Sequence, residues 1–110
     1  MPPWKKLSIY TSEGSRFGTR PLHSAIIATA LEQELYSVMA LKAMEGFGPQ
    51  MAILTANQMA LASDLPIEVR ILDEAAIIEA FLTDQAEMLT GCLITLEDIE
   101  IVQLPPSVLS

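Results

Sequence analysis

The sequence predicts an α+β domain with four strands and two helices in the order βαββαβ. Two observations support this fold class. Polar and apolar residues alternate with period two over residues 6–11 and again over 67–72, as they do in half-buried strands. After each of these strands, over residues 21–35 and 73–91, apolar residues recur three and four positions apart, which is typical of amphipathic helices.

The first strand and the first helix are joined by a polar connection. Leu7 and Ile9 lie on one face of the strand at residues 6–11, which predicts that this face is buried. Residues 12–20 are polar and contain glycine, and Pro21 then suits a first helical position, where no backbone N–H is needed. The helix that follows has the apolar stripe Leu22, Ile26, Ile27, Ala30, Leu31 and Leu35.

The second strand is predicted over Ser37 to Met44 and stops at Gly46-Phe47-Gly48. Glycine adopts positive φ without steric cost and lets a ligand approach the backbone, so this tripeptide is either a sharp turn or the lip of a binding site. Residues 49–63 have neither charge nor a clean period, and Asp64-Leu65-Pro66 marks their end. We therefore expect a long connection containing a short strand or a helical turn, mobile in the absence of a partner.

The second half of the chain repeats the strand, helix and strand pattern. Residues 67–72 alternate strictly, and Asp73 is predicted to cap the second helix. The apolar stripe of this helix is Ile78, Phe81, Leu82 and Leu89, and Thr90-Gly91 is predicted to end it. The fourth strand is predicted from Leu93 to Leu104, followed by a tail over 104–110.

The order βαββαβ, with both helices on one face of an antiparallel sheet, is the ferredoxin-like arrangement. It leaves the other sheet face open. The sequence places Tyr10, Leu72, Val102 and Leu104 on that face, and a solvated sheet would not carry such residues. We therefore predict self-association through the open face, for which a cyclic trimer is one closed solution and a dimer is another.

The composition restricts the compartment and the classes of partner. With 14 acidic and 6 basic side chains, the formal net charge is −8, which argues against binding to nucleic acid or to an anionic membrane. No segment is long enough to span a membrane, and the N-terminus lacks the apolar stretch of a signal peptide. Cys92 is the one cysteine, which fits a reducing compartment. We predict a cytoplasmic protein with one domain, residues 1–110, and a core over about residues 5–103.

The connection before the first helix is the best candidate for an anion site. It carries Arg16 and Arg20, two of the six bases, with two hydroxyls and two glycines next to a helix N-terminus, where free N–H groups favour negative charge. Lys42 is the other base close to a Gly-rich turn, Gly46-Phe47-Gly48. The alternative is a solvated turn whose arginines pair with surface acids. Phe47 in turn either stacks on a base or fills a subunit interface.

Other reactive residue types give weaker signals. His23 has no paired nucleophile, so a surface or interface position is favoured over a catalytic role. The methionines lack ligand spacing with His or Cys, so the residues indicate no metal site. These patterns favour a binding protein over an enzyme.

Six short motifs, in this order and at these spacings, resemble the PII-like family known as domain of unknown function 190. They are Glu13-x-x-Arg16, Arg20-Pro21-Leu22, Gly46-Phe47-Gly48, Asp64-Leu65-Pro66, Ile78-x-x-Phe81-Leu82 and Thr95-Leu96-Glu97-Asp98. The resemblance implies a homotrimer of ferredoxin-like subunits related to PII signalling proteins and to the copper-tolerance protein CutA. In PII proteins, adenine nucleotides bind between subunits, and the loop between strands two and three engages target proteins. Residues 49–65 occupy the place of that loop.

The resemblance therefore implies a regulatory protein that senses an anionic metabolite, an adenine nucleotide, and regulates a membrane transporter, a channel or an enzyme. PII proteins also use a basic loop before the last strand, whereas residues 90–92 carry no base. The predicted ligand site consists of Arg16, Arg20, Lys42, Gly46, Phe47 and Gly48. The alternatives are an acylphosphatase-like hydrolase, for which the chain offers one asparagine, Asn57, and a CutA-like metal-binding protein.

Overall fold

The computed structural model describes residues 1–48 and 64–106. The connection predicted over 49–63 and the end of the tail lie outside the described residues. The elements are β1 (Trp4–Ser12), β2 (Arg16–Phe17), β3 (Arg20–Pro21), α1 (Leu22–Glu32), β4 (Ser37–Lys42), β5 (Pro66–Glu74), α3 (Ala75–Asp84) and β6 (Leu93–Ile99).

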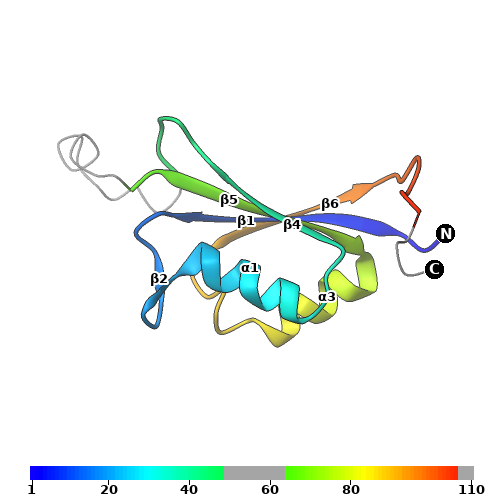
Figure 1. Cartoon of the computed structure of the whole chain (residues 1–110), viewed down its shortest axis with the longest axis horizontal. Coiled ribbons are helices and arrows are strands. Elements are labelled where there is room, and N and C mark those ends of the chain that lie inside the picture. Colours follow the sequence, from blue (N-terminus) through cyan, green and yellow to red (C-terminus); the bar gives the residue numbers. More distant parts are fainter. Residues whose placement is uncertain (49–63, 107–110) are drawn as a thin grey trace.

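Four of the strands form one sheet in the order β4-β5-β1-β6, and every neighbouring pair is antiparallel. Both helices lie on the same side of this sheet (Figure 1). The short strands β2 and β3 pair with each other in the connection that leads into α1. This architecture confirms the predicted ferredoxin-like α+β fold.

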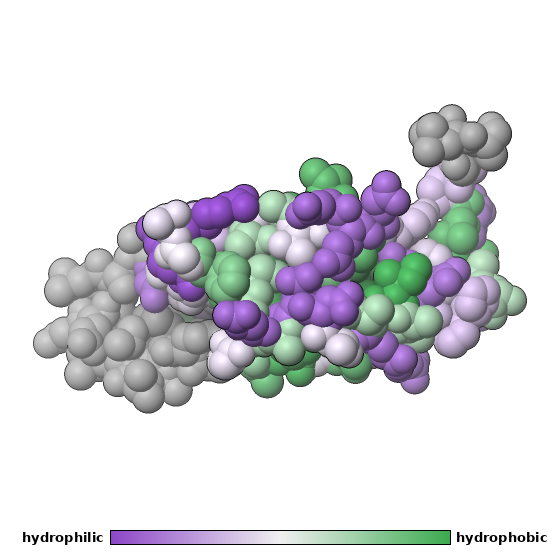
Figure 2. Space-filling view, turned by 90° about the horizontal axis from the view of Figure 1, so that it is seen from below, coloured by the Kyte–Doolittle hydropathy of each residue, from purple (hydrophilic) through white to green (hydrophobic). Residues whose placement is uncertain are grey.

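The core lies between the sheet and the two helices. On β1, Leu7 and Ile9 are fully buried and stand opposite Ile71 and Val69 of β5. The helices cover these residues with a buried set that consists of Leu22, Ala25, Ile26, Ala30, Ile78 and Phe81. Because period-two strands and helical stripes meet in this layer, the periods in the sequence predict it, except that Leu31 of the predicted helical stripe is 75% exposed. Hydrophilic side chains cover much of the middle of the outer, helical side (Figure 2).

The second helix is shorter than predicted. α3 ends at Asp84, and residues 85–91 form turns instead of further helix. Met88 and Leu89 are both buried, although they are consecutive in sequence. The turns let both side chains reach the core, whereas the helical spacing predicted this for Leu89 alone. The connection to β6 therefore spans residues 85–92, and it still carries no base.

The last strand is also shorter than predicted, because β6 ends at Ile99. Its neighbour β1 begins at Trp4, which stands opposite Ile99, so no strand is available to pair with later residues. Val102 is 93% exposed and lies beyond the sheet with Leu104. The prediction that these two residues lie on the open sheet face is therefore wrong.

Asp73 does not cap the second helix as predicted. It belongs to β5 and is buried, while Glu74 occupies the N-cap position of α3 without a side-chain capping bond. The Asp73 carboxylate accepts the backbone N–H of Tyr36 at 2.9 Å and that of Glu74 at 2.7 Å. It therefore ties the entry of β4 to the end of β5. The ring of Tyr36 packs edge-on against Trp4, 5.1 Å between centroids.

Replacing Asp73 with Ala is expected to lower the free energy of unfolding by about 2–3 kcal/mol, because two backbone N–H groups lose a charged acceptor. Asp84→Ala is the matched control, since Asp84 is exposed at the end of α3. We expect this control to stay within about 0.5 kcal/mol of wild type in urea denaturation. Equal effects of the two substitutions would contradict a structural role for the Asp73 carboxylate.

Candidate functional site

The connection between β1 and α1 forms a two-stranded ribbon that exposes both of its arginines. Arg16 stands opposite Pro21, and Phe17 stands opposite Arg20. Because directly opposed residues share a face of an antiparallel pair, Arg20 shares a face with Phe17, and Arg16 lies on the other face. Neither arginine makes an ion pair within residues 1–48 and 64–106.

Backbone bonds fix the base of this ribbon. The N–H of Ser15 donates to the carbonyl of Ser12 at 3.2 Å, and the N–H of Leu22 donates to the carbonyl of Ser15 at 2.8 Å. Pro21 is the N-cap of α1, whereas the sequence predicted it at the first helical position. The first turn has no side-chain capping bond and no acidic residue to offset the helix dipole. The ribbon therefore holds two cationic side chains beside the positive end of a helix.

A third cation, Lys42, lies at the strand-end corner, which we define as Glu13, Gly14, Lys42, Ala43 and residues 64–66. Here β1 and β4 end and β5 begins. The ammonium of Lys42 lies 3.5 Å from Oε1 of Glu13. Backbone bonds from Glu13 to Leu65 (3.1 Å) and from Ala43 to Pro66 (2.9 Å) close the corner, and the Gly14 N–H donates to Oδ1 of Asp64 at 2.6 Å.

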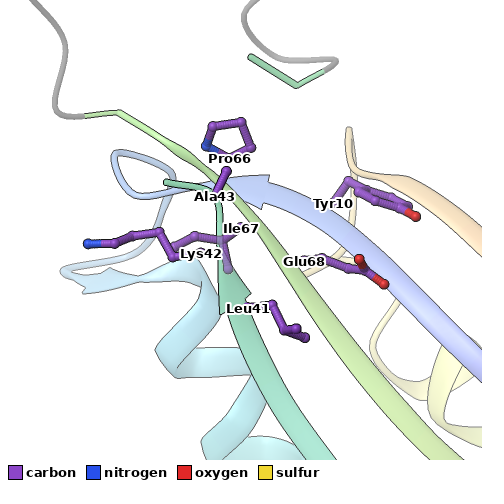
Figure 3. Close-up of a pocket in the computed structure, with 7 residues that line it drawn as sticks. All are labelled: Tyr10, Leu41, Lys42, Ala43, Pro66, Ile67 and Glu68. Carbon is purple, nitrogen blue, oxygen red and sulfur yellow. The ribbon is translucent and has the colours of Figure 1, made fainter. Parts of the chain in front are cut away.

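Lys42 lies between two hollows. One, of about 260 Å³, lies on the open sheet face and is lined by Tyr10, Leu41, Ala43, Pro66, Ile67 and Glu68 together with Lys42. In it the Lys42 amine points away from the Glu68 carboxylate (Figure 3). The other hollow, of about 350 Å³, is lined by Glu13, His23, Ala40, Lys42 and Ile67. Lys42 stands opposite the core-facing Ile67, and the second hollow is the one that it shares with Glu13, its ion-pair partner. A ligand in the second hollow can therefore meet the Lys42 amine.

The predicted Gly-rich lip, Gly46-Phe47-Gly48, begins three residues after Ala43 of the strand-end corner. Gly46 has φ +134°, a conformation that residues with a side chain rarely adopt, and bends precede it at Met44 and Glu45. The positive φ explains the glycine, and the choice between a sharp turn and a binding lip stays a prediction. Phe47 is 65% exposed within the chain. Among the described residues, no hydrogen bond or ion pair joins this lip to the arginines of the ribbon.

The distribution of ion pairs separates the bases of the ribbon from the rest. Four of the six bases are paired with acids: Lys5 with Asp98, Lys6 with Glu97, Lys42 with Glu13 and Arg70 with Glu68. Within the part of the chain that the structure describes, Arg16 and Arg20 are the cations left without an acidic partner. These two residues therefore carry the cationic charge that is free to meet an anion.

The open face of the sheet combines apolar side chains with satisfied ionic groups. Met39, Leu41, Leu72 and Leu93 lie on it with Tyr10. At its centre the Glu68 carboxylate accepts hydrogen bonds from Arg70 Nε at 2.7 Å and from Ser8 Oγ at 2.9 Å. The bond from Arg70 holds the pKa of Glu68 below its ordinary value. Because these charges are paired within the chain, covering the face leaves neither unpaired.

The remaining reactive groups form no catalytic arrangement in the described part of the chain. The Nδ1 atom of His23 is buried and has no hydrogen-bond partner among the described residues. Burial raises the pKa of the Cys92 thiol, which makes it less reactive. Within residues 1–48 and 64–106, no cluster of His, Cys, Asp and Glu could hold a metal ion, and no helix is long and apolar enough to cross a membrane. Asn57 lies outside the described residues.

The fold is that of PII-like signalling proteins. CPII from Thiomonas intermedia K12, in a structure bound to ADP, AMP and acetate, matches with a TM-score of 0.61 and 13% identity, over 93% of this chain and 91% of CPII. A putative PII-like signaling protein from Thermus thermophilus matches with a TM-score of 0.60 and 12% identity, over 92% of this chain and 91% of that protein. At such identities, the likeness establishes the fold alone.

The family is established from the sequence. The chain belongs to the family described as DUF190 (Uncharacterized ACR, COG1993), whose model matches residues 4–101. It is also 35% identical, over 100 residues, to the UPF0166 protein of Aquifex aeolicus (strain VF5), and the match covers 91% of this chain and 94% of that protein. Both findings confirm the family that the six motifs predicted.

The predicted site residues fall into two groups in the structure. Arg16 and Arg20 lie on the ribbon, whereas Lys42 and residues 46–48 follow one another at and beyond the end of β4. Glu13 and Asp64 hold the strand-end corner together, a role that the sequence pattern does not indicate. Both residues belong to motifs that indicated the family, and their place in these motifs is the sequence signal that could have identified them as important.

Proposed function

We propose that this chain is a PII-like regulatory protein that binds a small anionic metabolite, an adenine nucleotide, and is not an enzyme. The observation that carries the proposal is that two arginines, on a short ribbon beside the N-terminus of α1, have no acidic partner within residues 1–48 and 64–106. In so acidic a chain, free cationic charge next to a helix N-terminus suits a phosphate group. CPII, which shares this fold, has been solved with ADP and AMP and with ADP and bicarbonate.

In this proposal the active form is a cytoplasmic homotrimer, and the nucleotide binds at a subunit boundary. Arg16, Arg20 and Lys42 supply charge, and Gly46 and Gly48 let the ligand approach the backbone while Phe47 stacks on the base. The apolar residues of the open sheet face support the assembly. Residues 49–65 engage the regulated partner, a membrane transporter, a channel or an enzyme, as the corresponding loop of PII proteins does.

A thermal-shift screen against ADP, AMP, ATP and bicarbonate tests this function. A ligand present at about 100 times its dissociation constant should stabilise the protein by roughly 2.7 kcal/mol. We expect at least one adenine nucleotide to raise the melting temperature, with no hydrolysis of the bound nucleotide. The absence of a shift with every nucleotide at millimolar concentration would reject nucleotide sensing, and turnover of the nucleotide would show an enzyme instead.

A further inference from the structure

Lys42 is the one cation at the strand-end corner, and it has an anionic partner within the same chain. Its ammonium lies 3.5 Å from Oε1 of Glu13. The two side chains are 57% and 29% exposed, so this ion pair is in contact with solvent and can be broken at low cost. A ligand anion that uses Lys42 must therefore compete with a carboxylate of the same chain.

The backbone of Glu13 is held in place independently of that ion pair. Its N–H donates to the carbonyl of Leu65, and the N–H of the following Gly14 donates to Oδ1 of Asp64. A Cβ atom at Gly14 would lie 2.9 Å from this Asp64 oxygen, so glycine permits the close approach. The Glu13 carboxylate is thus kept near Lys42 whether or not the ion pair is formed, which gives it a high effective concentration.

We propose that Glu13 is an internal competitor of the anionic ligand and sets the affinity of the Lys42 site. This inference rests on the proposed function and concerns how the affinity for the ligand is regulated. When the ligand is absent, Glu13 neutralises Lys42. When a phosphate group binds, it displaces the carboxylate, so monoanionic ligands such as carboxylates are disfavoured relative to phosphates, which carry more charge.

Glu13→Gln tests the inference, because it removes the charge and keeps the shape of the side chain. We expect the dissociation constant for ADP, measured by titration calorimetry, to fall by about two- to fivefold, the range for loss of an exposed ion pair. Glu45→Gln is the matched control: it removes an exposed carboxylate three residues from Lys42 that has no ion pair within the described residues. This control should change the affinity by less than the Glu13 substitution does.

A second comparison separates competition for Lys42 from general repulsion of the ligand. In a Lys42→Met background, Glu13→Gln should give no more gain than Glu45→Gln does. An equal gain from both glutamine variants, or a gain from Glu13→Gln that persists without Lys42, would overturn the inference while leaving nucleotide binding intact.

Failure of the proposed function can be told apart from failure of the Glu13 inference. If the wild-type chain binds none of ADP, AMP and ATP, that proposal fails, and the Glu13 inference is then tested on inorganic phosphate and acetate. Tighter phosphate binding in Glu13→Gln, with the gain abolished by Lys42→Met, would support the competitor role. Unchanged binding of both anions would reject it. Circular dichroism and melting curves of each variant check that the fold is intact.

Discussion

Replacing Leu72 with Glu is expected to break the proposed trimer into single chains. Leu72 lies on β5 in the open face of the sheet, opposite Lys6 of β1 and Ser37 of β4. In a trimer packed through this face, every subunit would bury a carboxylate, and the penalty is several kcal/mol for each ion. The single chain tolerates the change, because Lys6 stands directly opposite the new carboxylate. Light scattering at micromolar concentration measures the change in mass.

Leu31→Glu is the matched control for this experiment. Leu31 is 75% exposed on α1, on the helical side of the sheet, so its substitution places the same charge on the other side of the molecule. We expect this variant to keep the mass of the wild-type assembly. A wild-type protein that is already monomeric, or an assembly that survives Leu72→Glu, would argue against packing through the open face.

The assembly prediction connects the fold to the ligand site. One of the two hollows beside Lys42, of about 260 Å³, lies on the same sheet face as Leu41 and Tyr10, so a neighbouring subunit that covers the face also covers this hollow. We therefore expect Leu72→Glu to lose nucleotide binding together with the trimer, although it leaves every proposed ligand residue in place. Retention of full ADP affinity by single chains would place the binding site within one subunit.

The fold could be predicted from the sequence because its core follows simple periods. Alternation in β1 and β5 puts Leu7, Ile9, Val69 and Ile71 in one layer, and the structure buries all four. Element ends are harder to predict, because they depend on partners that are distant in the chain. β6 ends at Ile99 because Ile99 is paired with Trp4, the first residue of β1. The apolar residues that follow Ile99 in the sequence do not reveal that their pairing partner is missing.

Contacts between distant segments also explain what the sequence did not show at the site. Asp73 has the spacing of a helix cap, but its carboxylate is used by the backbone of Tyr36, which lies 37 positions earlier. The partner of Lys42 could not be identified either, since any of the 14 acids was available. Arg16 and Arg20 are close in sequence, yet the ribbon puts them on opposite faces because of its register.

Replacing Arg16 and Arg20 together with Ala is expected to weaken ADP binding by an order of magnitude or more. Each charge-assisted hydrogen bond to phosphate is worth about 1.5–3 kcal/mol, and within the described residues no acid competes for these two guanidinium groups. Since the two side chains leave opposite faces of the ribbon, a single ligand meets them unequally. One of the two single substitutions should therefore account for most of the loss.

Lys5→Ala is the control for the change in net charge. Lys5 lies at the other end of β1 from the strand-end corner and is paired with Asp98 at 2.7 Å. We expect its substitution to leave the ADP affinity within about twofold of wild type, because exposed charges separated by more than a Debye length are screened.

Calorimetry of the double arginine variant, with light scattering on the same sample, distinguishes a ligand-binding role of Arg16 and Arg20 from a role in contacts between subunits. Unchanged affinity would exclude the ribbon from the ligand site, whereas dissociation of the assembly would assign the arginines to ion pairs between subunits.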